Sequence, residues 1–229
     1  MKLILLLLLL LTAALSGKAP ERTCRILFLA GPPDAPRTLQ LFDGKGSREV
    51  ELPRMNFSPV YELPAGALTL YLLPTAPADP TRIPAKAPAT TVPEGVTDFY
   101  LLVTSDPANP VAPVRMQLIN AGEDKLKRGQ MLWFNLTADV VGGTLGSRSL
   151  LIAAGGRAVL GAPVNGNEDY PVSLSFRIPG NEQLYPLCET RWRHDPRGRE
   201  VVFILPQDGR RSPRVIGFSD FREPPSTKP

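Results

Sequence analysis

The residues best suited to chemistry lie in one short stretch, 191–200, which reads RWRHDPRGRE. It holds four arginines, one tryptophan and the only histidine of the 229-residue chain. Arginine binds carboxylates and phosphates through paired N–H donors, and an indole ring can stack on the flat face of a ligand. The stretch therefore indicates either a contact site for an anion or a glycan, or a charged turn between two strands.

The turn interpretation explains the order of these residues. Residues 195–198, Asp-Pro-Arg-Gly, are typical of a β-turn, because proline presets the backbone and glycine tolerates positive φ. Along the preceding strand Trp192 alternates with Arg193, so the indole should face inward and the guanidinium group should be solvated. We prefer this reading, and keep as candidate binding residues Trp192, Arg193, Arg197 and Arg199.

A nucleic-acid partner is not expected. A second basic cluster, Arg210, Arg211 and Arg214, lies beyond the strand predicted at 201–205. At about 3.3 Å per residue the two clusters are roughly 20 Å apart, about two Debye lengths at physiological salt. The formal net charge of +4 is also too small to indicate a polyanion partner.

Metal and cofactor sites are not expected either. One histidine and two cysteines cannot supply a His-rich zinc site or paired CxxC ligands. The glycines of 142–147, GGTLGS, are not followed by the lysine of a phosphate-binding loop, and we interpret them as a flexible connection between strands. The loop 165–170, NGNEDY, could offer oxygen ligands to calcium, but Asn-Gly is a strong hairpin-turn signal, which we prefer.

No catalytic motif is recognisable, so we expect a protein that is not an enzyme. A Ser-His-Asp triad through His194 stays open, because triads assemble across a fold, although Asp195 is better explained by the turn. A hydrolase with a pair of carboxylates also stays open as an alternative. The aromatic pair Trp133 and Trp192 admits carbohydrate stacking, but an isolated tryptophan at an alternating strand position is more often part of a core.

The N-terminal residues predict export. Residues 1–16 combine one lysine with a long apolar run and small residues near the end, which is typical of a signal peptide. A helix over the apolar run would reach only about 20 Å of a hydrocarbon core of roughly 30 Å. We therefore expect no stable membrane span after cleavage, and a secreted or periplasmic protein of the cell envelope. A lipid anchor is disfavoured, because Cys24 follows Glu21, Arg22 and Thr23 rather than small residues.

The two cysteines admit two interpretations. An exported protein can form disulfides, and a bridge from Cys24 to Cys188 would join the first strand to the second half of the chain. Its chain-entropy contribution would be about 5 kcal/mol. Alternatively, each cysteine is a small buried apolar residue.

Period-two alternation and frequent turns predict an all-β protein. The 26 prolines of the chain disfavour long helices. One hairpin is expected around 43–46, DGKG, and another around 64–66, PAG, each between alternating runs. Further strands are predicted at 99–104, 114–119, 131–137, 148–153, 172–177, 187–193, 201–205 and 214–218. This spacing is typical of β-sandwiches.

The domain boundary has two possible positions. The segment 74–95 carries six prolines and could be a linker with polyproline II character. Alternatively it connects strands within a first sandwich that covers 17–120. We prefer the second division, with a short linker at 121–128, a second sandwich at 129–223 and a disordered tail at 224–229.

Several segments suggest a family. LPAGALTLYL at 63–72 is similar to the turn and following strand of transthyretin-like and carboxypeptidase-regulatory-like sandwiches, and ILFLAGPPDAP at 26–36 is similar to secreted bacterial repeats of unknown function. MLWFNLT, LIAAGG and RWRHDPRGREVVF resemble the distal part of uncharacterised exported bacterial proteins. The resemblance implies export and two Ig-like or transthyretin-like β-sandwiches in tandem, and it implies no catalytic residue.

From these patterns we expect an exported protein with a binding or structural role, whose partner is a glycan or an envelope protein. One alternative is an accessory domain for assembly or adhesion that acts by pairing of strand edges. Another is the secreted hydrolase with a carboxylate pair. A binding module should show arginines and aromatic residues together on a concave or flat patch.

Overall fold

The computed structural model describes residues 22–209 and 212–222. Within these ranges the chain forms sixteen β-strands and no helix, so it contains no helix able to span a membrane. The all-β prediction is confirmed. The predicted signal peptide at 1–16 and the predicted tail at 224–229 lie outside the described residues.

The first β-sandwich contains eight strands in two sheets. One sheet has the order β4-β1-β7-β8 and the other the order β3-β2-β5-β6. The strands are β1 (Arg22–Phe28), β2 (Thr38–Phe42), β3 (Ser47–Glu51), β4 (Tyr61–Leu63), β5 (Leu68–Leu73), β6 (Ala89–Val92), β7 (Asp98–Ser105) and β8 (Val114–Asn120). At the predicted turn 43–46, the Asp43 carboxylate accepts hydrogen bonds from two backbone N–H groups, and β2 and β3 form the expected hairpin. The hairpin predicted around 64–66 is wrong, because β4 pairs with β1 whereas β5 pairs with β2 and β6 in the other sheet.

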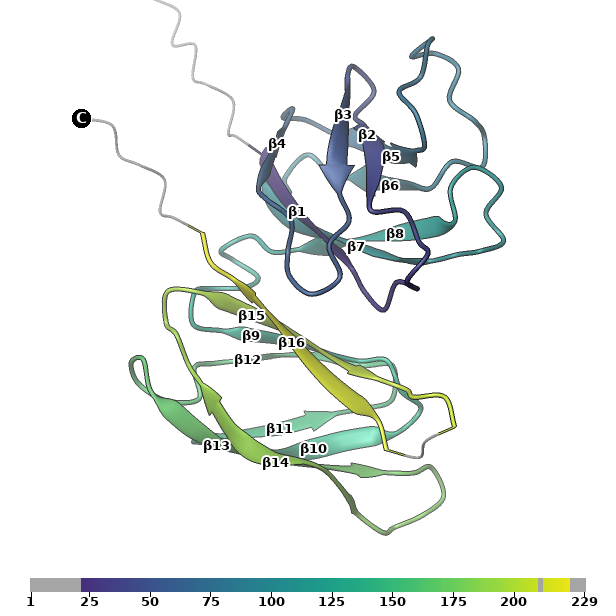
Figure 1. The fold of residues 1–229 in the computed structure, drawn as a ribbon. Coiled ribbons are helices and arrows are strands. Elements are labelled where there is room, and N and C mark those ends of the chain that lie inside the picture. Colours follow the sequence, from purple (N-terminus) through teal and green to yellow (C-terminus); the bar gives the residue numbers. More distant parts are fainter. Residues whose placement is uncertain (1–21, 210–211, 223–229) are drawn as a thin grey trace, which may run out of the picture.

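The second β-sandwich also contains eight strands in two sheets, with the orders β12-β9-β15-β16 and β11-β10-β13-β14. The strands are β9 (Met131–Asn135), β10 (Val140–Leu145), β11 (Arg148–Ile152), β12 (Arg157–Leu160), β13 (Asp169–Arg177), β14 (Tyr185–Arg193), β15 (Arg199–Leu205) and β16 (Arg214–Asp220). The two sandwiches are stacked, so that four sheets follow one another from top to bottom in Figure 1.

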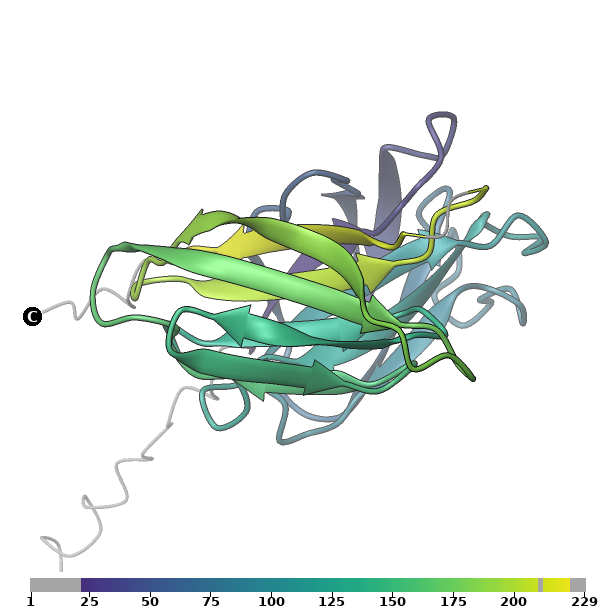
Figure 2. The same ribbon diagram turned by 90° about the horizontal axis from the view of Figure 1, so that it is seen from below.

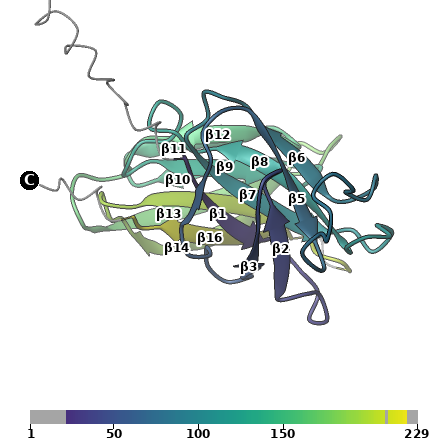
Figure 3. The same cartoon turned by 90° about the horizontal axis from the view of Figure 1, so that it is seen from above.

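Both sandwiches have the same topology. When the strands of each are counted from one to eight, both contain one sheet of order 4-1-7-8 and one of order 3-2-5-6. In each, the first and seventh strands pair in parallel, β1 with β7 and β9 with β15. The chain therefore contains one eight-strand unit twice, and Figures 2 and 3 show the stack from its two ends.

Three large apolar cores hold this arrangement together. Each sandwich has its own core, and a third core lies between them, where the sheet of β1 and β7 packs against the sheet of β9 and β15. Its buried members are Leu27, Leu29, Phe57, Tyr100, Leu102, Ile119, Ala121, Leu126, Leu132, Val201, Phe203, Leu205 and Phe218. The sandwiches are thus joined through an apolar interface rather than only by a linker.

The proline-rich segment 74–95 lies within the first sandwich. It connects β5 to β7 and contains β6, which pairs with β5. Since β7 and β8 share a sheet with β1, the linker interpretation of this segment is wrong. The segment 121–130 connects β8 to β9, and its Leu126 is buried in the core between the two sandwiches.

Two further expectations need correction. The segment 142–147 is not a flexible connection, because most of it belongs to β10, an inner strand paired with both β11 and β13. Of the two interpretations of the cysteines, the structure does not contain the disulfide: both cysteines are free. Cys24 is fully buried in the first sandwich core, whereas Cys188 packs against the core of the second, so the interpretation as buried apolar residues describes them better.

Candidate functional site

A buried ion-pair network lies where the two sandwiches meet. At its centre is Asp220, the last residue of β16, whose side chain has no exposed surface. Its carboxylate accepts hydrogen bonds from Arg25 Nη1 at 2.6 Å, Arg199 Nη2 at 2.9 Å and Arg222 Nε at 3.0 Å. The Tyr100 hydroxyl donates a further one at 2.6 Å. Residues of both sandwiches therefore converge on one carboxylate.

Asp98 is the second acid of this network. It accepts a hydrogen bond from Arg199 Nη2 at 2.8 Å, another from Arg222 Nη1, and one from the Thr23 hydroxyl at 3.2 Å. Arg199 and Arg222 therefore each bridge the two carboxylates. Both guanidinium groups also lie over the Tyr100 ring, at 5.8 and 5.7 Å from its centroid, which adds cation–π attraction.

The network keeps Asp220 ionised. Burial by itself would raise the pKa of the Asp220 carboxyl group, but the charge of Arg222 and the hydrogen bond from Tyr100, together with the other guanidinium groups, outweigh burial. The pKa of Asp220 is therefore lowered. Burial, followed by the negative charge of Asp220, raises the pKa of Tyr100 well above its usual range, so the tyrosine remains a neutral donor.

The network forms one wall of a pocket of about 610 Å³ between the sandwiches. Its charged lining residues are Arg25, Arg128, Arg197, Arg199, Arg222, Asp98, Glu123 and Asp220. Five arginines against three acids leave a formal excess of two positive charges. Val60 and Phe221 add apolar surface, and these residues are 44 and 53% exposed. This is a concave surface that combines arginines with an aromatic ring.

Arg222 has an unused donor in this pocket. Its Nη2 atom is buried and has no hydrogen-bond partner among the described residues. A buried guanidinium N–H without an acceptor is costly, and an oxyanion would satisfy it. At the rim, Arg128 is exposed and makes one long hydrogen bond, 3.5 Å, to the carbonyl oxygen of Arg197. The pocket thus offers both an inner and a peripheral arginine to an anion.

The predicted site residues separate into two groups. Arg199 and Arg197 line the arginine-rich pocket, but Arg199 is buried and paired rather than a solvated residue of a turn. Arg197 is exposed and pairs with Asp195 at 2.6 Å, as expected for the turn. Arg193 lies elsewhere, hydrogen-bonded to Asn167 at 2.8 Å, with its neighbour Trp192. The stretch 191–200 is therefore a strand and turn that contributes only its C-terminal half to the pocket.

Trp192 packs as a half-buried strand residue. Its ring stacks on that of the fully buried Trp133, with centroids 5.9 Å apart and an interplanar angle of 11°, and it meets Tyr170 edge-on. Trp133 therefore belongs to the core, while Trp192 closes that core at the edge strand β14. One part of the indole remains accessible to solvent.

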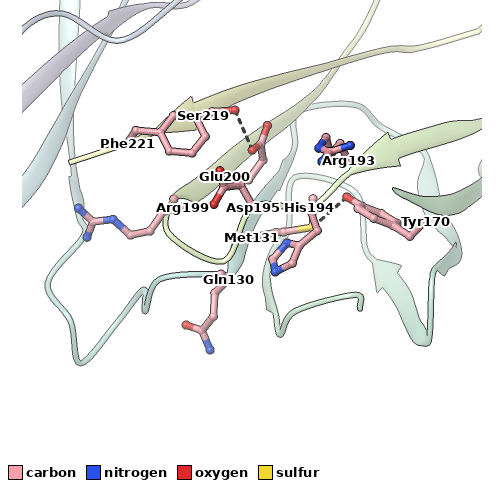
Figure 4. A pocket seen from close by; sticks show the side chains of 12 residues that line it. Gln130, Met131, Tyr170, Arg193, His194, Asp195, Arg199, Glu200, Ser219 and Phe221 are labelled. Carbon is pink, nitrogen blue, oxygen red and sulfur yellow. Dashed lines mark hydrogen bonds between the residues drawn. The ribbon is translucent and has the colours of Figure 1, made fainter. Parts of the chain in front are cut away.

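His194 lines a small cavity of about 50 Å³ next to the arginine-rich pocket (Figure 4). The side chain is buried, its Nε2 atom has no partner among the described residues, and burial lowers its pKa. In the same view the Arg199 side chain points away from His194. Its guanidinium group bonds to Asp98 of the first sandwich. No described serine is hydrogen-bonded to this histidine, so the geometry offers no support for a triad.

The structure also tests the proposed carboxylate chemistry. Asp98 and Asp220 do share a pocket, yet both are held by arginines, and the pKa of Asp220 is lowered. A general acid needs a carboxyl group with a raised pKa, so Asp220 is not suited to be the general acid of a glycoside hydrolase. In the described part of the chain no group of three or more histidine, cysteine, aspartate or glutamate residues is placed to hold a metal ion.

Four charged residues of the network were missed from the sequence, Arg25, Asp98, Asp220 and Arg222. They lie in or next to β1, β7 and β16, up to 197 positions apart, and no local motif joins them. The available signals were weak: Asp98 directly precedes the apolar run 99–103, and Arg222 follows Asp220 by two positions.

Comparison with known proteins gives no family. No family model matches the chain, and no curated protein matches it. The site is therefore interpreted from its geometry.

Proposed function

We propose that this chain is an exported, non-enzymatic β-sandwich protein that binds an anionic ligand in the arginine-rich pocket at the junction of its two sandwiches. The observation that carries the proposal is the buried Nη2 atom of Arg222, which has no acceptor among the described residues and belongs to an arginine that lines a pocket with an excess of positive charge. The ligand chemistry it fits is an oxyanion, such as a carboxylate, a sulfate or a phosphate.

The remaining lining residues favour a ligand that is not a bare ion. A pocket of about 610 Å³ has room for a small organic molecule, and Val60 and Phe221 offer it an apolar contact. An acidic sugar fits these properties, because it combines a carboxylate with a ring that can lie against Phe221. Secretion or residence in the periplasm follows from the predicted signal peptide and stays part of the proposal.

The family resemblance also belongs to this proposal. The resemblance is supported by the loop between β4 and β5, where Gly66 has a positive φ of 89°, as a Pro-Gly turn requires.

Pairing of strand edges is less well supported as a function. The edge strand β14 carries exposed charged residues, Glu189, Arg191 and Arg193, and charges on an edge disfavour pairing with another strand.

Calorimetric titration of the chain from Gly17 onward tests the proposal. The probes are inorganic phosphate, inorganic sulfate, glucuronate and neutral glucose. We expect glucuronate to bind more tightly than either inorganic ion, and glucose not to bind this pocket. Arg128→Gln should weaken glucuronate binding about tenfold without unfolding the protein, because Arg128 is exposed and makes a single long hydrogen bond.

Arg82→Gln is the matched control, since Arg82 is an exposed arginine paired with Asp79, and neither residue lines the pocket. Equal loss in both variants would show a general charge effect and contradict the site. Absence of binding by all three anions would overturn the proposed function. Binding of the inorganic ions alone would keep the anion site but reject a sugar acid.

A further inference from the structure

A second groove lies at the open edge of the second sandwich, between the edge strands β14 and β16. At the opposite edge β11 and β12 contact each other, whereas β14 and β16 are far less closely joined. The resulting groove has a volume of about 370 Å³. Its lining includes Trp192, Tyr170 and Arg193 from one sheet and Glu200, Gly217 and Ser219 from the other.

We propose that this groove binds a neutral oligosaccharide. The inference does not rest on the anion pocket, because the two sites have no lining residue in common. It rests on an aromatic platform next to a carboxylate, a hydroxyl group and a guanidinium group, a combination suited to the apolar face and hydroxyl groups of a pyranose.

Trp192 provides the platform. Stacking on Trp133 and the edge contact with Tyr170 fix the plane of its ring, so little conformational entropy is lost when a sugar ring lies against it. The indole is half-buried in β14, which leaves part of its surface facing the groove. A rigid, partly exposed aromatic ring is the usual anchor of a binding site.

Glu200 and Ser219 provide the polar contacts. Ser219 Oγ donates a hydrogen bond of 3.0 Å to Glu200 Oε2, as Figure 4 shows, and Glu200 Oε1 has no partner among the described residues. A Cβ atom on Gly217 would lie 2.9 Å from this Oε1 atom. The glycine therefore leaves room for the carboxylate, whose free oxygen can accept hydrogen bonds from sugar hydroxyl groups.

The charges of the groove distinguish among ligand classes. The Glu200 carboxylate would repel an acidic ligand, and Arg193 is already engaged by Asn167 and, at 3.5 Å, by Asp169. An added peptide strand would have to pair with β14, where Glu189 and Arg191 disfavour it. A neutral sugar meets neither obstacle.

Tryptophan fluorescence gives a direct readout, because Trp133 is buried and the chain has only two tryptophans. The probes are cellohexaose, xylohexaose, maltohexaose and chitohexaose, with hexagalacturonate and a hexaglutamate peptide as acidic comparisons. We expect at least one neutral hexasaccharide to bind and to protect Trp192 from acrylamide quenching. The acidic probes should give no protection.

Two variants locate the binding. Trp192→Ala should lower the affinity about tenfold, the loss expected for one stacking contact, and calorimetric titration measures it because this variant lacks the reporting indole. If that variant fails to fold by circular dichroism, Glu200→Gln provides the test, since it keeps the shape of the side chain while weakening its acceptor. Leu184→Ala and Glu49→Gln are the controls, because both residues are exposed and lie outside the groove.

The inference is overturned if no neutral hexasaccharide binds, or if Glu200→Gln and a folded Trp192→Ala bind as the unchanged protein does. Equal protection by hexagalacturonate or by the peptide would also overturn it. Arg128→Gln separates this inference from the proposed function, because it should weaken glucuronate binding and leave the neutral sugar unaffected.

Discussion

Arg199 donates a hydrogen bond of 2.8 Å to Asp98, and these two residues occupy the same place in the two sandwiches. Each is the first residue of the seventh strand of its own sandwich, Asp98 in β7 and Arg199 in β15. The repeated topology therefore brings corresponding positions face to face at the junction, where one copy carries an acid and the other a base. This pair and Asp220 form an ion-pair network at one end of the interface between the sandwiches, which is otherwise apolar.

Removal of the central carboxylate should destabilise the protein. Asp220→Asn leaves three guanidinium groups with one acid among them, and loss of one partner of a buried ion pair costs about 3 kcal/mol. Urea unfolding monitored by circular dichroism measures the change. Asp79→Asn is the control, because Asp79 belongs to an exposed ion pair, and it should leave the transition unchanged. Equal stability of the two variants would contradict a structural role for the network.

Acidification should weaken the same network. A carboxyl group whose pKa is lowered by folding stabilises the folded state above its unfolded pKa and loses this contribution as the pH falls through the folded value. For Asp220 the ordinary value is 3.8, so its contribution is complete at neutral pH and is lost below about pH 4. We expect the urea midpoint to fall more steeply in the unchanged protein than in Asp220→Asn over this range. Parallel curves would contradict this linkage.

The sequence was sufficient to predict the layer architecture but not the interface. Alternation and turn residues identified most strands, because a strand with one wet face has period two. β7 and β15 do not alternate: residues 99–103 and 201–205 are buried throughout, since both faces of these strands are covered. The continuous apolar runs at 99–103 and 201–205 indicated strands covered on both faces. Because we predicted these strands from alternation alone, the contact between the two sandwiches was not predicted.

The inner strand β10 shows a second limit of prediction from the sequence. Its glycines suggested flexibility, whereas the structure uses them for close approach between strands. The ion-pair network shows a third limit. Its members lie in or next to β1, β7, β15 and β16, and they become neighbours only when the two sandwiches pack together. Composition could show that arginines exceed lysines in the second half, but not which arginines would be buried.

Substitution of Gly143 should disturb β10 strongly. A Cβ atom there would lie 2.0 Å from the carbonyl oxygen of Ser173 in the paired strand β13, and the residue has a φ of 150°, which non-glycine residues rarely adopt. We expect Gly143→Ala to lower the free energy of unfolding by about 3 kcal/mol. Gly95→Ala is the matched control, because nothing lies within 4 Å of its added Cβ atom. Similar unfolding curves for the two variants would show that β10 can move away from β13.

The two thiols should be free and should differ in reactivity. Cys24 is completely buried, and burial raises the pKa of its thiol to about 12, so almost no thiolate forms at pH 8. Cys188 is only partly buried on the edge strand β14, and its pKa is raised by the same cause. A timed iodoacetamide reaction followed by peptide mass mapping without reductant should therefore modify Cys188 first. In denaturant both thiols should react at the same rate. A disulfide-linked peptide that contains Cys24 and Cys188 would contradict this prediction.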